Sequence, residues 1–127
     1  MEQFNENISR GSLFLIEGEE NNSAKPWYNH PKFKGVSMKN LITSSQTEGR
    51  FSAHLVKVEP GDTLDEHIHE GKTELHEVVA GSGIFYLDGR KWDYKQGDTA
   101  VIPANTNHKV VAGNEGIFIM AKFFPAL

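Results

Sequence analysis

Cysteine is absent from the 127-residue sequence, which excludes disulfides, thiolate metal ligands and a cysteine nucleophile. Clusters of basic residues are absent too: 13 Lys and Arg stand against 17 Asp and Glu, for a formal net charge of −4. This balance argues against nucleic acid as a partner. No apolar run approaches the roughly 20 residues of a membrane span, and the polar N-terminus lacks the features of a signal peptide. We therefore expect a soluble, cytoplasmic, single-domain protein.

Sustained helical periodicity is also missing, and short apolar runs separated by glycine, proline and asparagine predict an all-β sandwich or barrel. We expect residues 1–35 to form an irregular arm and residues 36–127 to form the barrel. Within the arm, Leu13–Ile16 could be a strand that pairs with the barrel's own edge or with a neighbouring subunit. The expected barrel strands are residues 36–43, 51–58, 74–80, 84–87, 91–94, 99–102, 108–111 and 117–123.

One turn can be predicted in detail. The Asp88–Gly89 dipeptide lies between two apolar runs, which is a strong signal for a two-residue type I′ hairpin. Such a turn pairs Leu87 with Arg90 and Phe85 with Trp92. The two aromatic rings are then expected to pack against each other across the strands.

A cluster of histidines and a carboxylate carries the chemistry of this sequence. His67 and His69 are two residues apart, so on a strand they share one face. If the polar loop at residues 70–73 closes a hairpin, His69 lies opposite Glu74 and His67 lies opposite His76. Imidazole and carboxylate groups suit a first-row divalent metal such as iron, manganese, zinc or nickel. The alternative is a solvated polar hairpin whose histidines are incidental.

The segment from Gly61 to Gly81 resembles the first motif of the cupin family. Gly61 is followed by five residues, His67, one residue, His69, four residues, Glu74, six residues and Gly81, so every fixed position of the motif matches. This first motif is the specific one.

The segment from Gly97 to Ala112 resembles the second, looser cupin motif. Pro103 and His108 stand at their expected positions, whereas Asn105 replaces the usual glycine and Ala112 replaces the usual asparagine. Asparagine tolerates the left-handed conformation that glycine would supply, so the loop is still expected to form.

The resemblance implies an antiparallel double-stranded β-helix, the jelly-roll barrel of cupins. It also implies one divalent metal ion per subunit, and carried over residue by residue the ligands are His67, His69, Glu74 and His108. A small-molecule ligand or substrate is the implied partner.

Two further histidines are candidate catalytic residues. His76 shares a face with Glu74 and could replace it as a ligand, or act beside it as a general acid or base. His54 faces the lumen if Lys57 faces solvent, where it could contact substrate or be a satisfied core histidine. His30 is expected to lie at the surface or to pack within the arm.

These features favour an enzyme that acts on a small, polar, oxygen-rich molecule, by dioxygenase, isomerase or lyase chemistry. The alternatives are a non-catalytic module that binds or senses a small ligand, and a barrel whose metal is only structural. The apolar segment 117–127 has too many alternating apolar residues for one small core, so part of it is expected to cover a subunit interface in a homodimer.

Overall fold

The structure is a computed structural model that describes residues 7–127. Its strands are antiparallel, which confirms the all-β prediction. Within the described residues, no helix has the length and apolar character that a membrane crossing requires. The strands are β1 (Ser12–Leu15), β2 (Gly18–Asn21), β3 (Trp27–Asn29), β4 (Val36–Ile42), β5 (Ser52–Val58), β6 (Thr63–His67), β7 (Thr73–Leu87), β8 (Arg90–Lys95), β9 (Thr99–Ile102) and β10 (His108–Phe124).

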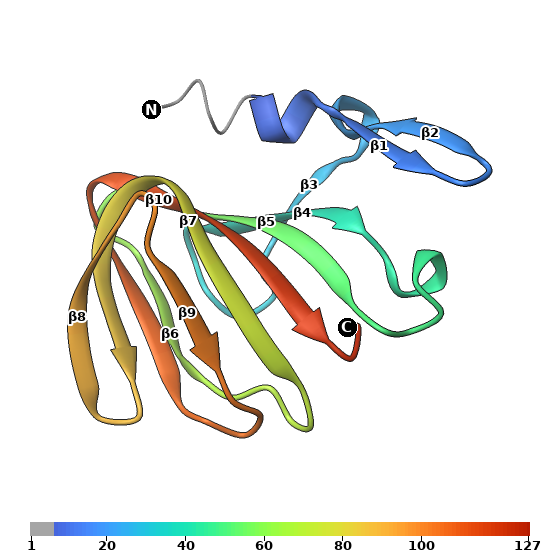
Figure 1. Cartoon of the computed structure of the whole chain (residues 1–127). Coiled ribbons are helices and arrows are strands. Elements are labelled where there is room, and N and C mark those ends of the chain that lie inside the picture. The colour runs from blue at the N-terminus through green and yellow to red at the C-terminus, as the bar shows by residue number, and fades with distance from the viewer. Residues whose placement is uncertain (1–6) are drawn as a thin grey trace.

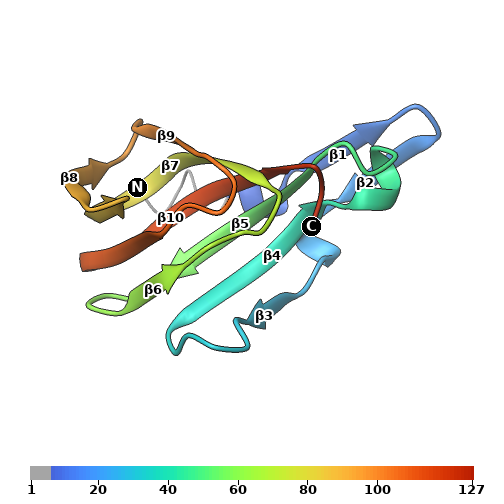
Figure 2. The same cartoon turned by 90° about the horizontal axis from the view of Figure 1, so that it is seen from below.

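Two long strands, β7 and β10, run through both layers of the barrel (Figures 1 and 2). The second half of β10 pairs with β5 and with the start of β7, whereas its first residues pair with β6 and with the end of β7. One layer therefore has the order β3-β4-β5-β10-β7-β9 and the other has the order β6-β10-β7-β8. This is the expected jelly-roll arrangement.

Glycines allow β7 and β10 to bend from one layer to the other. Gly81 has a φ of +78°, and a Cβ at this position would lie 2.1 Å from the carbonyl oxygen of Gly116. A Cβ on Gly83 would lie 2.2 Å from the carbonyl oxygen of Val111. Residues 74–80 and 84–87, expected as two separate strands, belong to one strand, because hydrogen bonding continues through the bend from Thr73 to Leu87.

The predicted hairpin is confirmed. Leu87 pairs with Arg90 and Phe85 pairs with Trp92. Both residues of the Asp88–Gly89 turn have positive φ, 49° and 83°, as a type I′ turn requires. The rings of Phe85 and Trp92 stack with centroids 6.3 Å apart, so the hairpin register places one aromatic in the core and its partner at the surface.

A second predicted hairpin does not form. β6 ends at His67 and pairs with β10, where His67 lies opposite His108. The loop after β6 then crosses to the other layer, where β7 begins. The expected pairings of His69 with Glu74 and of His67 with His76 are therefore wrong, because a polar loop of this length can join two layers as well as two neighbouring strands.

The barrel interior is filled by apolar side chains from both layers. Each fully buried valine, isoleucine or phenylalanine stabilises the fold by about 1.5–3 kcal/mol relative to an exposed one. These side chains surround the inward-facing polar groups and hold them in place. The buried cluster consists of Val36, Val56, Val58, Leu64, Val78, Phe85, Tyr94, Ile102, Val110, Ala112, Ile117, Ile119, Ala121 and Phe123.

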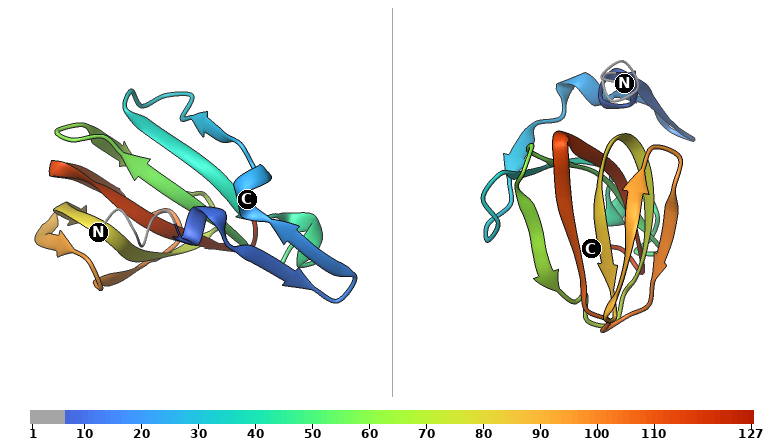
Figure 3. Two further views of the ribbon diagram at one scale, coloured as in Figure 1. Left: turned by 90° about the horizontal axis from the view of Figure 1, so that it is seen from above. Right: turned by 90° about the vertical axis from the view of Figure 1, so that its left-hand side faces the viewer.

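The N-terminal segment is more regular than predicted. β1, which contains most of the expected Leu13–Ile16 strand, pairs with β2 rather than with the barrel, and β3 extends the barrel sheet beside β4. The buried Lys39 of β4 donates hydrogen bonds to the carbonyl oxygens of Ser9 (2.8 Å) and Asn22 (2.9 Å). This lysine ties the segment to the outer face of the sheet, across which it lies in Figure 3.

Candidate metal centre

Four side chains converge at one end of the barrel. The loops before β7 and β10 lie at this end, which is the lower end in Figure 1. The four residues are His67 at the end of β6, His69 in the following loop, Glu74 in β7 and His108 at the start of β10. One potential ligand atom from each lies within 4.8 Å of all the others. The structure thus brings together the four residues that the sequence predicted, although the strand pairing differs from the predicted one.

Backbone carbonyls fix the orientation of two of these imidazoles. Nδ1 of His67 lies 2.7 Å from the carbonyl oxygen of Asp65, and Nδ1 of His108 lies 3.0 Å from that of Thr106. A carbonyl oxygen only accepts hydrogen bonds, so each Nδ1 carries the hydrogen. Each Nε2 is then left with its lone pair, the form of histidine that binds metals.

Two buried atoms at the centre have no hydrogen-bond partner. These are Oε1 of Glu74 and Nε2 of His108, which lie 3.2 Å apart in residues that are 3% and 1% exposed. Nε2 of His69 lies 3.4 Å from the same oxygen. Unpartnered buried polar atoms are costly, and a cation between them would satisfy both. The four residues therefore fit a divalent metal ion.

The protonation states of the cluster suit a metal as well. Burial, with the neighbouring His108, lowers the pKa of His67 to about 4. Burial also lowers the pKa of His69. Burial alone would raise the pKa of Glu74, but His76, which donates a hydrogen bond to the carboxylate, counteracts burial, and the pKa lies below its ordinary value. At neutral pH, His67 and His69 are neutral imidazoles and Glu74 is a carboxylate, as metal binding requires.

The cluster has a closed side and an open side. The side chains of His108 and Glu74 are 0% and 4% exposed, whereas that of His69 is 24% exposed. The ring of Phe33 lies 5.8 Å from that of His67 on the open side, and His30 stacks on Phe33 at 4.7 Å. Sequence reasoning missed Phe33, because no motif signals that the loop between β3 and β4 folds back over the site.

The family comparison agrees with this geometry. The model described as "Cupin domain" matches residues 54–120, which is more than half of the chain. The chain belongs to the cupin family. The match begins within β5 and ends within β10, so it includes all four residues of the metal cluster.

Several individual proteins are similar to this chain. The oxalate-binding protein of Thermotoga maritima is 27% identical over 89 residues, which cover 68% of this chain and 73% of that protein. The acireductone dioxygenase of Acidiphilium cryptum is 36% identical over 89 residues, 60% of this chain and about half (49%) of that protein. The structure of KdgF from Halomonas sp. superposes with a TM-score of 0.73 at 26% identity, covering 89% and 94% of the two chains.

His76 lies behind Glu74 in this cupin and is not one of the four clustered residues that could hold a metal ion. Its Nε2 is 2.9 Å from Oε2 of Glu74, and its Nδ1 is 3.1 Å from the hydroxyl of Tyr94. Burial raises the pKa of Tyr94, which keeps the phenol protonated. Both ring nitrogens are thus engaged within the protein. A general acid or base role for His76 stays a prediction.

His54 is 5% exposed and its ring lies 5.6 Å from that of Phe123, a member of the buried cluster, so it faces the lumen, as predicted. Its Nδ1 lies 2.7 Å from Oδ1 of Asn40, and its Nε2 lies 2.9 Å from the hydroxyl of Ser52. Burial lowers the pKa of His54, so the ring is neutral at neutral pH, with Nδ1 donating and Nε2 accepting. The contacts match a satisfied core histidine, one of the two alternatives that the sequence left open; contact with substrate stays a prediction.

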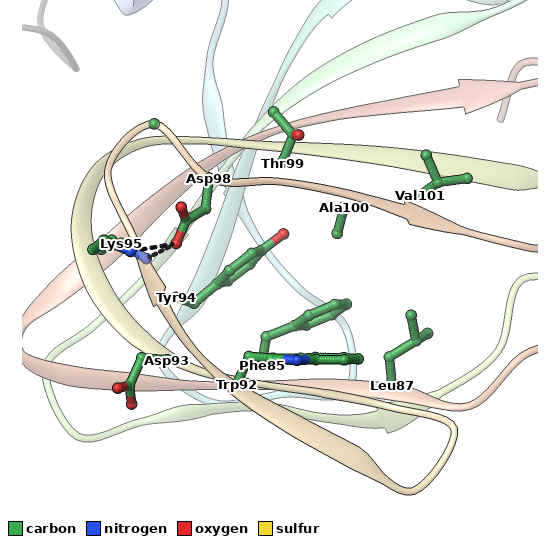
Figure 4. Close-up of a pocket in the computed structure, with 11 residues that line it drawn as sticks. Phe85, Leu87, Trp92, Asp93, Tyr94, Lys95, Asp98, Thr99, Ala100 and Val101 are labelled. Atoms are coloured by element: carbon green, nitrogen blue, oxygen red, sulfur yellow. Dashed lines mark hydrogen bonds and ion pairs between the residues drawn. The ribbon is translucent and has the colours of Figure 1, made fainter.

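A cavity of about 630 Å³ opens between β8 and β9 (Figure 4). Tyr94 and Phe85 form part of its wall, with their rings nearly parallel and 4.6 Å apart. None of the four clustered residues lines this cavity. Tyr94 contacts His76 as well, so these two side chains lie between the cavity and the metal centre.

Proposed function

We propose that this cupin is a metal-dependent enzyme acting on a small, polar, oxygen-rich molecule, by dioxygenase, isomerase or lyase chemistry. One divalent ion of iron, manganese, zinc or nickel would be held by His67, His69, Glu74 and His108. The observation that carries the proposal is the pair of unpartnered buried atoms, Glu74 Oε1 and His108 Nε2, beside a partly exposed His69. One side of the cluster can thus hold the ion while the other admits a ligand.

The charge of the cluster supports an anionic ligand. Three neutral imidazoles and one carboxylate leave a divalent ion with a net charge of about +1. When bound, such an ion acts as a Lewis acid and a template for ligand oxygen atoms. The similar proteins also support a small, oxygen-rich ligand, because one is an oxalate-binding protein and another is an acireductone dioxygenase.

The chain's own side chains would limit access to the ion. The ring of Phe123 packs edge-on against His69 with centroids 4.7 Å apart, and Phe33 lies beside His67. These rings narrow the opening and exclude water from its walls, which strengthens electrostatic interactions inside. A small ligand that enters past them would meet the exposed side of His69.

A non-catalytic module that binds or senses a small ligand is the second candidate. Both ring nitrogens of His54 and of His76 are hydrogen-bonded within the protein. Neither histidine offers a free nitrogen for proton transfer to or from a ligand. This observation, and the similarity to a protein that binds oxalate, favour binding without conversion.

One experiment separates the two candidates. The protein is loaded in turn with Fe²⁺, Mn²⁺, Zn²⁺ or Ni²⁺ and incubated with oxalate, other small carboxylic acids, enediols and sugar acids. NMR spectra then report both binding and conversion of each compound. New product signals that Glu74→Gln eliminates would support an enzyme. Binding with no conversion would support the second candidate, and a protein that takes up no metal would contradict both.

We also propose that the protein is a homodimer. Phe14 and Ile16, at the end of the β1–β2 hairpin, are 75% and 105% exposed, and Leu127 is 49% exposed. Figure 3 shows the hairpin reaching beyond the barrel. Exposed apolar side chains of this kind suit contact with a second copy. Light scattering should give twice the chain mass, and replacing Phe14 and Ile16 by serine should lower it; a monomeric wild type would contradict the proposal.

A further inference from the structure

A buried chain of hydrogen bonds connects Tyr94 to the candidate metal ligand Glu74. The hydroxyl of Tyr94 lies 3.1 Å from Nδ1 of His76, and Nε2 of His76 lies 2.9 Å from Oε2 of Glu74. The three residues are only 3%, 1% and 3% exposed. The chain is therefore shielded from water, and its members depend on one another for hydrogen bonds.

The direction of each hydrogen bond follows from the groups themselves. A carboxylate only accepts, so Nε2 of His76 must carry a hydrogen and donate it to Glu74. In a neutral imidazole the other nitrogen then accepts, and the protonated phenol of Tyr94 is its donor. Tyr94 thus selects the form of His76 that can donate to the carboxylate.

The two oxygens of Glu74 have different surroundings. Oε2 accepts from His76, while Oε1 lies 3.4 Å from Nε2 of His69 and 3.2 Å from Nε2 of His108 with no hydrogen-bond partner. Rotation of the carboxylate would break the hydrogen bond at Oε2 and turn Oε1 away from the imidazoles. We propose that His76 and Tyr94 are positioning residues that hold Glu74 with Oε1 directed at the metal, an inference that rests on the proposed metal centre.

Tyr94 is itself held firmly. Its ring stacks on Phe85 at 4.6 Å, and Phe85 stacks in turn on Trp92 at 6.3 Å. Figure 4 shows these three rings side by side on β7 and β8, with the tyrosine hydroxyl directed away from the phenylalanine and tryptophan rings. The stack leaves the ring little freedom, so the hydroxyl stays within reach of His76.

The first test measures metal affinity by competition with a chelator, using Zn²⁺ and Co²⁺. We expect His76→Leu to raise the Kd about 10- to 100-fold, as is usual when a partner of a metal ligand is lost. Tyr94→Phe, which removes only a hydroxyl, should raise it about fivefold. His76→Gln should recover part of the loss, because its amide can donate to Oε2. Tyr86→Phe is the matched control: its ring contacts Lys109 instead, and its Kd should equal that of the wild type.

A second readout needs no metal. In long-range ¹H–¹⁵N spectra of the metal-free protein, Nε2 of His76 should carry the hydrogen in the wild type, and Tyr94→Phe should shift both ring nitrogen signals. A wild-type Nε2 without hydrogen would overturn the inference. The inference would also be overturned if the wild type binds metal and the His76→Leu variant has the same Kd and the same Co²⁺ absorption as the wild type. If the wild type binds no metal, the proposed function is contradicted instead. The ring nitrogen signals then still test the hydrogen bonds of His76 with Glu74 and Tyr94.

Discussion

The closed and the open side of the metal cluster are built differently. On the closed side, Glu74 is held by His76, and His76 by Tyr94, with hardly any exposed surface. On the open side, His69 is partly exposed and packs against the ring of Phe123, while the ring of Phe33, from the loop between β3 and β4, lies beside His67.

The difference indicates that the two sides have separate roles, one in metal binding and the other in ligand access. Buried hydrogen bonds fix ligand geometry, because leaving any of them unmade is costly. Aromatic rings on the open side make no hydrogen bonds to the ligands, so they can shape access without changing metal affinity. Changes to the buried hydrogen bonds on the closed side should therefore alter metal binding, and changes to the aromatic rings on the open side should alter only what reaches the metal.

The largest effect is expected from Glu74→Gln on the closed side. The change removes the charge and leaves a weaker ligand, so the Kd for Zn²⁺ should rise by more than about 100-fold, beyond the range of an outer partner. His76→Gln should raise the Kd less. Titration calorimetry measures both, and a larger loss for His76→Gln would give His76 the ligand role instead.

Removal of the metal should have the next largest effect. At a free metal concentration of about 100 times Kd, binding stabilises the fold by about 2.7 kcal/mol. For a chain of this size, a chelator should then lower the Tm by about 10 °C. Differential scanning calorimetry provides the measurement, with Glu74→Gln as a control whose Tm the chelator should leave unchanged. An equal response in that variant would show that the chelator acts elsewhere.

Phe33→Ala tests the open side. The loss of a half-buried ring should lower the free energy of unfolding by about 1–2 kcal/mol, while the Kd for metal stays that of the wild type. Affinity of the metal-loaded protein for oxalate, used as a probe, should change. Urea unfolding measures the free energy of unfolding, and calorimetric titration measures the two affinities. A higher Kd for metal in Phe33→Ala would contradict the proposal that the open side affects only ligand access.

The smallest effect is expected from pH. The pKa of His67 is about 4 in the fold, below the ordinary value of 6.5, so the unfolded chain binds more protons between these values. The free energy of unfolding of the metal-free protein should therefore fall as pH drops from 6.5 towards 4. The change is small because His67 is partly exposed. His67→Gln should flatten this dependence in urea titrations, and an unchanged slope would assign it to other groups.

The sequence predicted local structure well where a short-range rule applied. The Asp88–Gly89 turn demands positive φ at two positions, so its type and the pairing of Phe85 with Trp92 followed from the dipeptide. The four clustered residues, which could hold a metal ion, were found through motif spacing. The spacing identified these residues although the predicted strand pairing was wrong. His67 lies opposite His108 on β10, and not opposite His76 in a hairpin.

Long-range packing was beyond such rules. Gly81 and Gly83 have the sequence signature of a strand end, and only the close approach of Gly116 and Val111 shows that they allow a bend. The role of Lys39 depends on carbonyls far away along the chain. The placement of Phe33 beside His67 likewise follows from how a loop folds back, which depends on the whole barrel.

Anomalous diffraction from crystals of the protein grown with Mn²⁺ or Zn²⁺ would locate the ion directly. If the four clustered side chains hold it, each chain shows one peak, at about 2.0–2.2 Å from Nε2 of His67, Nε2 of His108, a ring nitrogen of His69 and Oε1 of Glu74. A peak coordinated by His76 in place of Glu74, or no peak among these four side chains, would contradict this assignment.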